Sequence, residues 1–419
     1  MYDLCVVGGG AAGISCAIAA GRLGLKVLLV DKNNKLGKKL YATGNGRCNL
    51  TNSQFDIIKH FNSSDNNYYA FVNDALDNAY NSKIPNQQII DYMDSIGIRT
   101  TNENNYIYPN SAQASSVVWA MVDELKLYNI EILLNTEIIN IAGKYPSFII
   151  KSQNKAYKAS QVVLSCGGAA YKSLGGTTAG YNLAKNIGHN IIPIRPCLCG
   201  LEVKEDVSEI AGVRAKVHIK LTDTNNNSFG ESSGELQITK QGLSGICIFE
   251  ISSQVGILLN KGITPIVNVS FFNNTDNLYK LLIEKVEHNN IGNRTVVGWL
   301  NGYVNDKIAQ YVCKKHNIDN KQISSQIPKT ILLNIINDLN NMTFTVTNLY
   351  DMEQAQLTAG GIEISDINPN TMESNITEGL YIVGELLDID GICGGYNLTF
   401  AMLTGLKAGK SVYDKNKSN

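Results

Sequence analysis

Three glycines spaced as Gly8-x-Gly10-x-x-Gly13 constrain the fold of this chain more than any other sequence feature. They stand between an apolar run at residues 2–7 and a small-residue helical run at 14–23. In a strand–turn–helix unit, the first glycine permits the tight turn, the second lets a pyrophosphate approach the backbone, and the third lets helix and strand pack closely. The helix N-terminus also offers free N–H groups to phosphate. The motif therefore predicts a dinucleotide site.

A second apolar run, at residues 26–30, completes a βαβ unit and ends at Asp31. A carboxylate at this position can accept hydrogen bonds from an adenosine ribose. Ala11, Ala12 and Lys32 flank these residues, and we include them in the predicted cofactor-binding set. A glycine-rich turn beside a surface aspartate is the alternative interpretation. The unit alone does not separate NAD from FAD.

The C-terminal part of the chain favours FAD. A predicted strand at residues 380–383 ends at Gly384-Glu385, whose carboxylate suits the hydroxyls of a ribityl chain. Gly394-Gly395 then begins the last helix, where the helix dipole stabilises the negative charge that the flavin N1–C2=O edge gains on reduction. A tight turn followed by a core aromatic, Tyr396, is the alternative for this segment.

A glycine- and lysine-rich loop at residues 36–52 is the third candidate element. Its small residues permit close backbone approach, and its cations could face a pyrophosphate or an anionic flavin. A solvated loop explains Lys38 and Lys39 individually. It explains the dense run from Gly44 to Asn49 poorly.

Cys48 lies in this loop, at a place where disulfide reductases of similar fold carry two cysteines separated by four residues. Thr43 and Ser53 occupy the positions five residues away on either side, so this redox couple is absent. We therefore expect Cys48 to be a small packing residue, because burial is usual for a free cysteine. No catalytic residue is predicted.

Changes in the residue pattern along the chain predict three domains. Residues 1–192 and 355–419 form a discontinuous α/β domain that binds the dinucleotide. Residues 193–273 and 340–354 alternate in short runs typical of an antiparallel sheet or barrel. Residues 274–339 have helical periodicity and form a small insertion.

Composition excludes several classes of protein. The chain has 419 residues, 44% of them hydrophobic, and a net charge of −1, which argues against disorder and against nucleic acid as the main partner. It has no apolar run long enough to span a bilayer, and Met1 leads straight into a strand with no signal-peptide pattern, so we expect a cytoplasmic protein. Nine cysteines with one close pair, Cys197 and Cys199, predict no metal site.

Several motifs together resemble the HI0933-like family of flavoproteins, the BaiN and YhiN group that includes aminoacetone oxidase-like proteins. The resemblance runs from residue 2 to about residue 410. The segments that carry it are Gly8–Gly13, Ala42–Asn52, Gly234-Glu-Leu with Thr239 and Gly242–Gly245, Thr358–Gly361, Thr371–Ser374, Gly384–Gly391 and Gly394–Leu398.

The resemblance implies a glutathione-reductase-like FAD-binding Rossmann domain, discontinuous in sequence, with an inserted β-barrel and a small helical domain. It also implies non-covalent FAD and oxidoreductase activity. Ile138 would meet the adenine through its backbone. The residues expected to line the cofactor are Gly8, Gly10, Ala11, Ala12, Gly13, Asp31, Lys32, Lys38, Lys39, Gly46, Arg47, Cys48, Asn49, Ile138, Cys166, Gly167, Gly384, Glu385, Gly395, Tyr396, Asn397 and Leu398.

One departure from the family concerns the substrate. The family usually has glutamine and tryptophans after Gly-Gly-Tyr-Asn-Leu, whereas residues 399–404 here read Thr-Phe-Ala-Met-Leu-Thr. The substrate preference of relatives is therefore not carried over to this chain.

The predicted function is an FAD-dependent oxidoreductase that transfers hydride between a small organic substrate or NAD(P)H and the flavin. The stretch from Gly167 to Gly180 contains no second GxGxxG motif, so a dedicated NAD(P)H domain is not expected, and transient NAD(P)H binding stays open. Three alternatives remain at this point: an NAD-dependent dehydrogenase, a flavin-dependent RNA-modifying protein, and a flavin-bound sensor without turnover. We expect no nucleic-acid or membrane partner.

Overall fold

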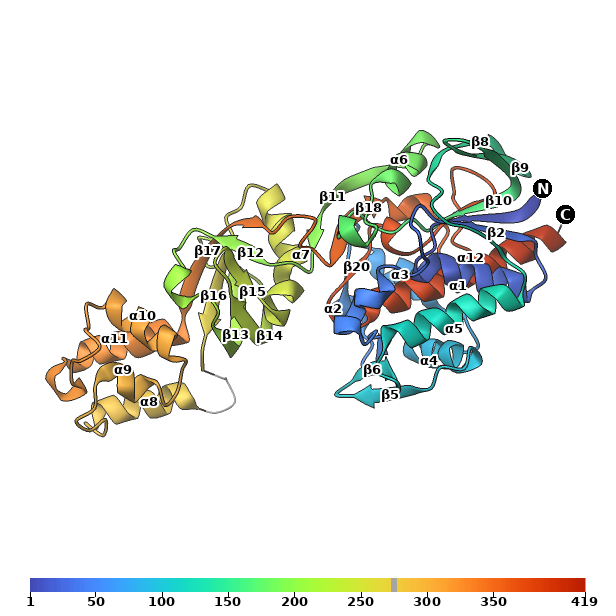
Figure 1. Ribbon diagram of the computed structural model, residues 1–419. Helices are drawn as coiled ribbons and strands as arrows, with labels where there is room; N and C mark the ends of the chain where they lie inside the picture. Colours follow the sequence, from blue (N-terminus) through green and yellow to red (C-terminus); the bar gives the residue numbers. More distant parts are fainter. Residues whose placement is uncertain (273–276, 419) are drawn as a thin grey trace. The chain divides into compact units, whose positions relative to one another are not determined.

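The computed structural model describes residues 1–272 and 277–418 and divides the chain into two compact units (Figure 1). The first unit comprises Met1–Arg195 and Gln356–Asn419, and the second comprises Pro196–Ala355. The predicted domain limits at residues 192 and 355 lie close to these boundaries. The predicted limit between residues 273 and 274 lies outside the described residues, as does residue 419. The three-domain division itself stays a prediction.

The first unit is built on a seven-stranded sheet in the order β7-β2-β1-β10-β9-β8, with β19 also paired to β10. Strands β7, β2, β1, β10 and β19 are parallel, whereas β9 and β8 continue the sheet as an antiparallel meander. Their bounds are β1 (Tyr2–Val7), β2 (Val27–Val30), β7 (Glu131–Leu133), β8 (Ile138–Lys144), β9 (Ser147–Ser152), β10 (Ala156–Leu164) and β19 (Leu380–Ile382).

The central strands form because they are short apolar runs that can be buried on both faces, as parallel strands require. All four residues of β2 are buried, and so are the last four of β1. The carboxyl ends of β1 and β10 lie together, since Val7 pairs with Leu164. The segments that follow these two strands therefore meet at one edge of the sheet.

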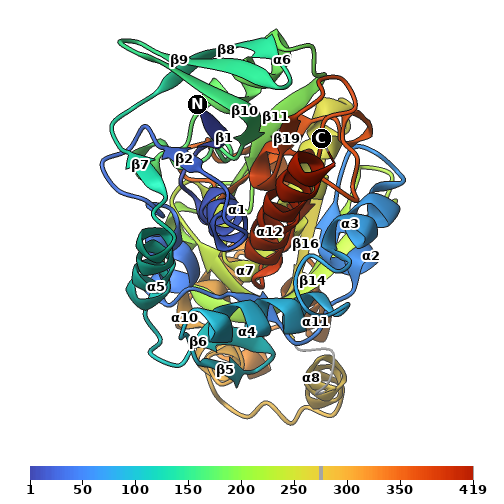
Figure 2. The ribbon, with the colours of Figure 1, turned by 90° about the vertical axis from the view of Figure 1, so that its right-hand side faces the viewer.

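Helices α1 (Ala11–Arg22) and α12 (Tyr396–Lys417) pack against each other unusually closely (Figure 2). A Cβ atom on Gly405 would lie 2.2 Å from the carbonyl oxygen of Ala12, and one on Gly409 would lie 2.5 Å from that of Cys16. Both contacts advance by four residues, so the helices run in the same direction. Counted from these contacts at 1.5 Å per residue, α12 begins about 12 Å ahead of α1.

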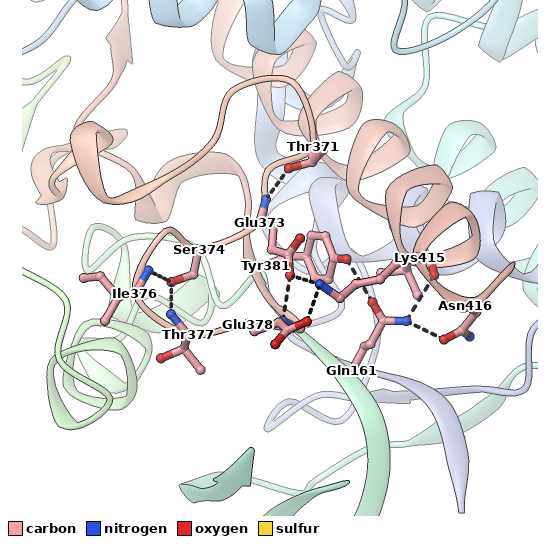
Figure 3. A network of polar contacts seen from close by, with 12 residues as sticks. Gln161, Thr371, Glu373, Ser374, Ile376, Thr377, Glu378, Tyr381, Lys415 and Asn416 are labelled. Atoms are coloured by element: carbon pink, nitrogen blue, oxygen red, sulfur yellow. Dashed lines mark hydrogen bonds and ion pairs between the residues drawn. The ribbon is translucent and has the colours of Figure 1, made fainter. Parts of the chain in front are cut away.

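The C-terminal end of α12 is fixed by a polar network (Figure 3). Lys415 Nζ lies 2.8 Å from Glu373 Oε1. Gln161 donates to the Asn416 side chain at 2.8 Å and accepts from the Tyr381 hydroxyl at 2.9 Å. Because Gln161 is on β10 and Tyr381 on β19, the network joins the helix to the sheet.

The remaining elements of the first unit surround this framework. Its other helices are α2 (Ile57–His60), α3 (Tyr68–Leu76), α4 (Pro85–Ser95), α5 (Ala114–Leu127) and α6 (Ala179–Asn186). Its smaller strands are β3 (Thr51–Asn52), β4 (Phe61–Asn62), β5 (Thr100–Glu103), β6 (Tyr106–Pro109), β18 (Leu357–Ile362), β20 (Asp390–Gly391) and β11 (Ile191–Cys197), whose last two residues belong to the second unit. Strands β3, β6 and β5 form a small sheet, and β11 pairs with β18.

The second unit contains a closed six-stranded barrel in the order β12-β15-β14-β13-β16-β17. Its strands are β12 (Leu201–Val203), β13 (Arg214–Thr222), β14 (Ser228–Ile238), β15 (Gly242–Ser244), β16 (Ile266–Ser270) and β17 (Met342–Leu349). Between β16 and β17 lie helices α8 (Leu278–Glu287), α9 (Val296–Leu300), α10 (Asp306–Lys315) and α11 (Lys329–Asn340). The predicted fold class, α/β with an inserted β-barrel and helices, is confirmed.

One local prediction was wrong. The region predicted to consist of short strands contains a long helix, α7 (Ile246–Asn260). Its sequence is apolar around most of its circumference and rich in isoleucine, so it lacks the one-sided periodicity of a surface helix. Burial against the barrel overrides the β-propensity of these residues.

None of the helices within the described residues is both long enough and apolar enough to cross a membrane.

The close packing of α1 and α12 predicts that Gly405→Ala destabilises the first unit. The added methyl group would meet backbone, which cannot rotate away, so we expect a loss of about 1–3 kcal/mol of unfolding free energy, as for overpacked cores. Calorimetry would measure it as a lowered unfolding temperature. Gly302→Ala is the control, because there the nearest atom to the new Cβ lies 3.5 Å away. An unchanged transition in Gly405→Ala would contradict the close approach.

Candidate flavin site

The glycine turn between β1 and α1 has the geometry that its spacing predicts. Gly8 has φ of +112°, and a Cβ atom there would lie 2.4 Å from the Ser165 carbonyl oxygen. A Cβ on Gly13 would lie 1.9 Å from the carbonyl oxygen of Gly8, so the helix sits directly against the turn. At Gly10, the N-cap of α1, a Cβ would meet nothing within 4 Å. The turn is therefore tightly packed at Gly8 and Gly13 and has free space beside Gly10.

Asp31 ties this turn to the end of β2. Its Oδ2 atom accepts from the backbone N–H of Gly9 at 2.6 Å, and its Oδ1 accepts from that of Asn33 at 2.7 Å. The carboxylate is buried, so these charge-assisted bonds hold the turn firmly. Thr136 N donates to the Asp31 carbonyl at 2.9 Å, which brings the segment leading to Ile138 to the same edge. The contacts of Asp31 with a ribose and of Ile138 with an adenine stay predictions.

Two further predicted segments lie beside the turn. Cys166 follows β10, and its Sγ donates to the Val7 carbonyl at 3.4 Å. Burial raises the pKa of this thiol to about 12, so it is not a thiolate at neutral pH. Gly167 has φ of +71° and open space at its Cβ position. Lys32 is half-buried, and its Nζ lies 3.4 Å from the Gly176 carbonyl oxygen.

An ion pair joins the lysine-rich loop to the C-terminal segment. Lys39 Nζ lies 2.8 and 3.0 Å from the two carboxylate oxygens of Glu385. Glu385 also accepts from the backbone N–H of Thr358 at 3.0 Å, and its side chain is only 15% exposed. Its neighbour Gly384 has φ of +69° and would place a Cβ 3.1 Å from that of Ala12 on α1. The structure thus brings three predicted segments together.

The dense part of the loop turns away from this ion pair toward β5 and β6. Arg47 pairs with Glu103 at 2.6 Å, and its guanidinium lies over the Tyr108 ring at 4.2 Å. Gly46 is exposed, and Lys38 is half-buried. Asn49 is buried, and its Oδ1 atom has no hydrogen-bond partner within the described residues. A contact between Arg47 and a cofactor stays a prediction.

Cys48 is fully buried, as a packing residue would be. Its backbone has φ of +60°, and its N–H donates to the Thr43 carbonyl at 3.0 Å. Burial raises the pKa of its thiol to about 11. All nine cysteines are free, so no dithiol pair is closed anywhere in the chain.

The start of α12 rests on the β3 segment. Gly395 has φ of +92°, and a Cβ there would lie 2.8 Å from backbone atoms of Thr51. Asn397 bonds both polar groups of the Gly391 backbone, at 2.8 and 2.7 Å, and Leu398 is half-buried. Tyr396 is buried in an aromatic cluster.

His60 belongs to that cluster, although its sequence context gave no sign of it. Its ring stacks on Tyr396 with centroids 4.2 Å apart, and burial lowers its pKa below the usual range. The nearest sequence signal is the aromatic pair Phe55 and Phe61 on either side of it, both of which pack with Tyr396.

The described residues fit an FAD molecule. No side chain caps α1 or α12, so the first-turn N–H groups of two parallel helices can take two acceptors at different places along one extended ligand. A Cβ on Gly10 or on Gly167 would meet no atom within 4 Å, so a pyrophosphate can approach the backbone there, and Asn49 Oδ1 is a buried acceptor. If the ligand were NAD, Gly384-Glu385 and the start of α12 would have no role in binding it.

The sequence model of the HI0933-like protein Rossmann domain matches residues 2–411. The chain belongs to the HI0933-like family.

Three proteins similar to this chain are a bile acid reductase, an RNA dihydrouridine synthase and, among solved structures, a steroid dehydrogenase. A 3-dehydro-bile acid delta(4,6)-reductase from Clostridium scindens is 32% identical over 99% of this chain and 100% of its own length. A ribosomal RNA dihydrouridine synthase from Escherichia coli is 26% identical, covering 96% of this chain and 95% of its own. A 3-ketosteroid delta1-dehydrogenase from Sterolibacterium denitrificans aligns with a TM-score of 0.49 and 12% identity, over 99% of both chains. This HI0933-like protein is an FAD-dependent oxidoreductase.

The buried thiol predicts that Cys48→Ser keeps both FAD and activity. A thiol with a pKa of about 11 is protonated at neutral pH and is no nucleophile, so the substitution changes packing alone. The measurement is the flavin content and the rate of substrate-dependent flavin reduction in the variant. Loss of reduction with FAD retained would show instead that the thiol takes part in the chemistry.

Proposed function

We propose that this protein transfers hydride between a non-covalently bound FAD and a small organic substrate, with NAD(P)H as a transient partner at the same flavin. The bile acid reductase relative supports a small organic substrate, because it matches this chain along its full length. The identity of that substrate is not carried over, since residues 399–404 depart from the family pattern.

The parallel packing of α1 and α12 carries the proposal. The turn from Gly8 to Gly13 would hold the pyrophosphate, with Asp31 at the adenosine ribose. Glu385 lies where the lysine loop meets α1, and it would take the ribityl hydroxyls. The start of α12, at Gly395 to Leu398, would face the flavin N1–C2=O edge. Gly167 and Asn49 complete the lining.

The chemistry is supplied by the flavin, which accepts or donates a hydride when it is bound. The chain binds and orients it. The positive end of the α12 dipole stabilises negative charge at its N-terminus, which favours the reduced state of a flavin held there. Lys39 neutralises Glu385 at 2.8 Å, so this half-buried carboxylate does not oppose that charge.

Direct transfer between substrate and flavin is favoured over a dithiol relay. A relay needs two thiols that can form a disulfide near the flavin. Thr43 and Ser53 replace the partner that Cys48 would need, and burial keeps Cys48 and Cys166 protonated. Hydride exchange with the substrate itself is the remaining route.

The RNA-modifying alternative has weaker support. Its basis is the similarity to ribosomal RNA dihydrouridine synthases, which are about a quarter identical to this chain. A protein that holds RNA by its phosphates usually carries an excess of basic residues, whereas this chain has 36 basic and 37 acidic side chains. A filter-binding measurement with ribosomal RNA at physiological salt separates the two functions.

Anaerobic bleaching of the purified yellow protein tests the proposal. NADH, NADPH, an amine panel and a steroid panel are each added without oxygen, and the flavin absorbance is followed. We expect one nicotinamide or organic donor to bleach the flavin in seconds to minutes, and an organic acceptor to restore the colour. Bleaching by dithionite but by none of these donors or acceptors would contradict hydride exchange with small molecules.

A further inference from the structure

Arg195 on β11 is a buried residue, and two of its three guanidinium nitrogens have no hydrogen-bond partner in the part of the chain that the structure describes. The residue is only 8% exposed. Its Nε and Nη2 atoms are buried and have no hydrogen-bond partner within the described residues. These two atoms form one edge of the guanidinium group, the edge that binds a carboxylate through two parallel hydrogen bonds. Burying charged N–H donors without a partner is unfavourable, so this edge of Arg195 points to an anionic ligand.

Strand β11 pairs with β18, and two contacts between them indicate a register in which Arg195 lies opposite Thr358. Glu363 N donates to the Asn190 carbonyl at 3.1 Å. Three residues earlier on β18, a Cβ on Gly360 would lie 2.4 Å from the Pro193 carbonyl oxygen. Residues further along β11 thus lie opposite residues earlier in β18, so the two strands are antiparallel. Continued by two more residues, the same register pairs Thr358 with Arg195.

Directly opposed residues of an antiparallel pair have their side chains on the same face. The side chain of Thr358 identifies the segment that this face contacts. Its Oγ1 accepts from the backbone N–H groups of Ala169 and Ala170 at 2.9 and 3.0 Å, just after Gly167 and Gly168. A Cβ on Gly168 would lie 2.4 Å from both Thr358 Oγ1 and Glu385 Oε1. Arg195 therefore lies on the face of the β11–β18 ribbon that adjoins the candidate flavin site.

The nearby carboxylate does not satisfy Arg195. Glu385 is paired with Lys39 through both oxygens and also accepts from Thr358 N. Within residues 1–272 and 277–418, no group therefore bonds the buried edge of the guanidinium, which is available to a ligand. A planar carboxylate matches its two parallel donors better than a single neutral oxygen does.

We propose that Arg195 binds a carboxylate of the substrate through its Nε and Nη2 atoms and so orients the substrate at the flavin. This inference rests on the proposed function for the identity of the ligand as a substrate. It narrows the substrate class to organic acids, with the reacting carbon held beside the flavin and the carboxylate held by Arg195.

The test is thermal stabilisation of the FAD-loaded full chain by benzoate, with benzamide as its neutral analogue and sodium chloride at equal ionic strength. A ligand that binds only the folded protein raises its unfolding temperature by an amount that grows with the logarithm of the ligand concentration over Kd. The variants are Arg195→Met, which keeps the stem and removes the charge, and Arg195→Lys, which keeps the charge and removes the two-donor edge. Arg214→Met is the control, because Arg214 is 62% exposed on the barrel.

We expect benzoate to stabilise the wild type and Arg214→Met, and benzamide to stabilise neither. We expect the benzoate Kd to rise at least tenfold in Arg195→Lys and stabilisation to vanish in Arg195→Met. Equal stabilisation of the wild type and both Arg195 variants would overturn the assignment, as would no stabilisation of the wild type. Should Arg195→Met not fold, the comparison of Arg195→Lys with the wild type decides alone.

The reduction potential of the bound flavin separates a substrate site from a contact with the flavin. We expect it to change little in Arg195→Lys. A clearly lower potential in Arg195→Lys, with benzoate binding unchanged, would show that the guanidinium faces the flavin and would overturn the proposal. If the wild type takes up no FAD, the proposed function fails, and the benzoate response of the protein without FAD still decides whether Arg195 binds a carboxylate.

Discussion

The close parallel contact between α1 and α12 is the interaction on which the site depends. Gly405 and Gly409 let the backbone of α12 approach the carbonyl oxygens of α1 to distances that no side chain would allow. Two helices that run in the same direction present two positive ends to the same region. At 1.5 Å per residue, the two helix starts are offset by about 12 Å. This separation suits two groups of one extended ligand and is too large for a single phosphate.

The other contacts of the site hold loops against this helix pair. Asp31 takes the N–H of Gly9, so the end of β2 fixes the glycine turn at the start of α1. Lys39 and Glu385 join a loop near the N-terminus to a segment near the C-terminus. Removing either partner would leave the other as an uncompensated, half-buried charge. A pair of this kind adds little net stability, so its main effect is to position the two segments. Residues from both ends of the chain thus depend on one another.

The sequence predicts the parts of the site whose function depends on local geometry. The spacing of Gly8, Gly10 and Gly13 demands a strand, a turn and a helix, and the structure has all three. The approach of Gly405 and Gly409 to α1 was missed, although two glycines one turn apart in a helix are a signal for close packing. The helix α7 was missed because it is apolar on most sides and therefore has no one-sided periodicity.

Tertiary contacts explain the remaining misses. The stacking of His60 on Tyr396 and the unpaired edge of Arg195 depend on segments far apart in the sequence, so no spacing reveals them. The ion pair of Arg47 with Glu103 is likewise a contact that spacing does not reveal, and a contact of Arg47 with the cofactor stays a prediction.

Hydrogen exchange of the apo-protein, measured with FAD and with ADP, tests the central claim most directly. If both ends of the chain hold one FAD, the cofactor will slow exchange in peptides that cover residues 8–13 and 394–399, whereas ADP will slow it in the first peptide alone. Protection by FAD confined to residues 8–13 would contradict the account, because the start of α12 would then take no part in binding.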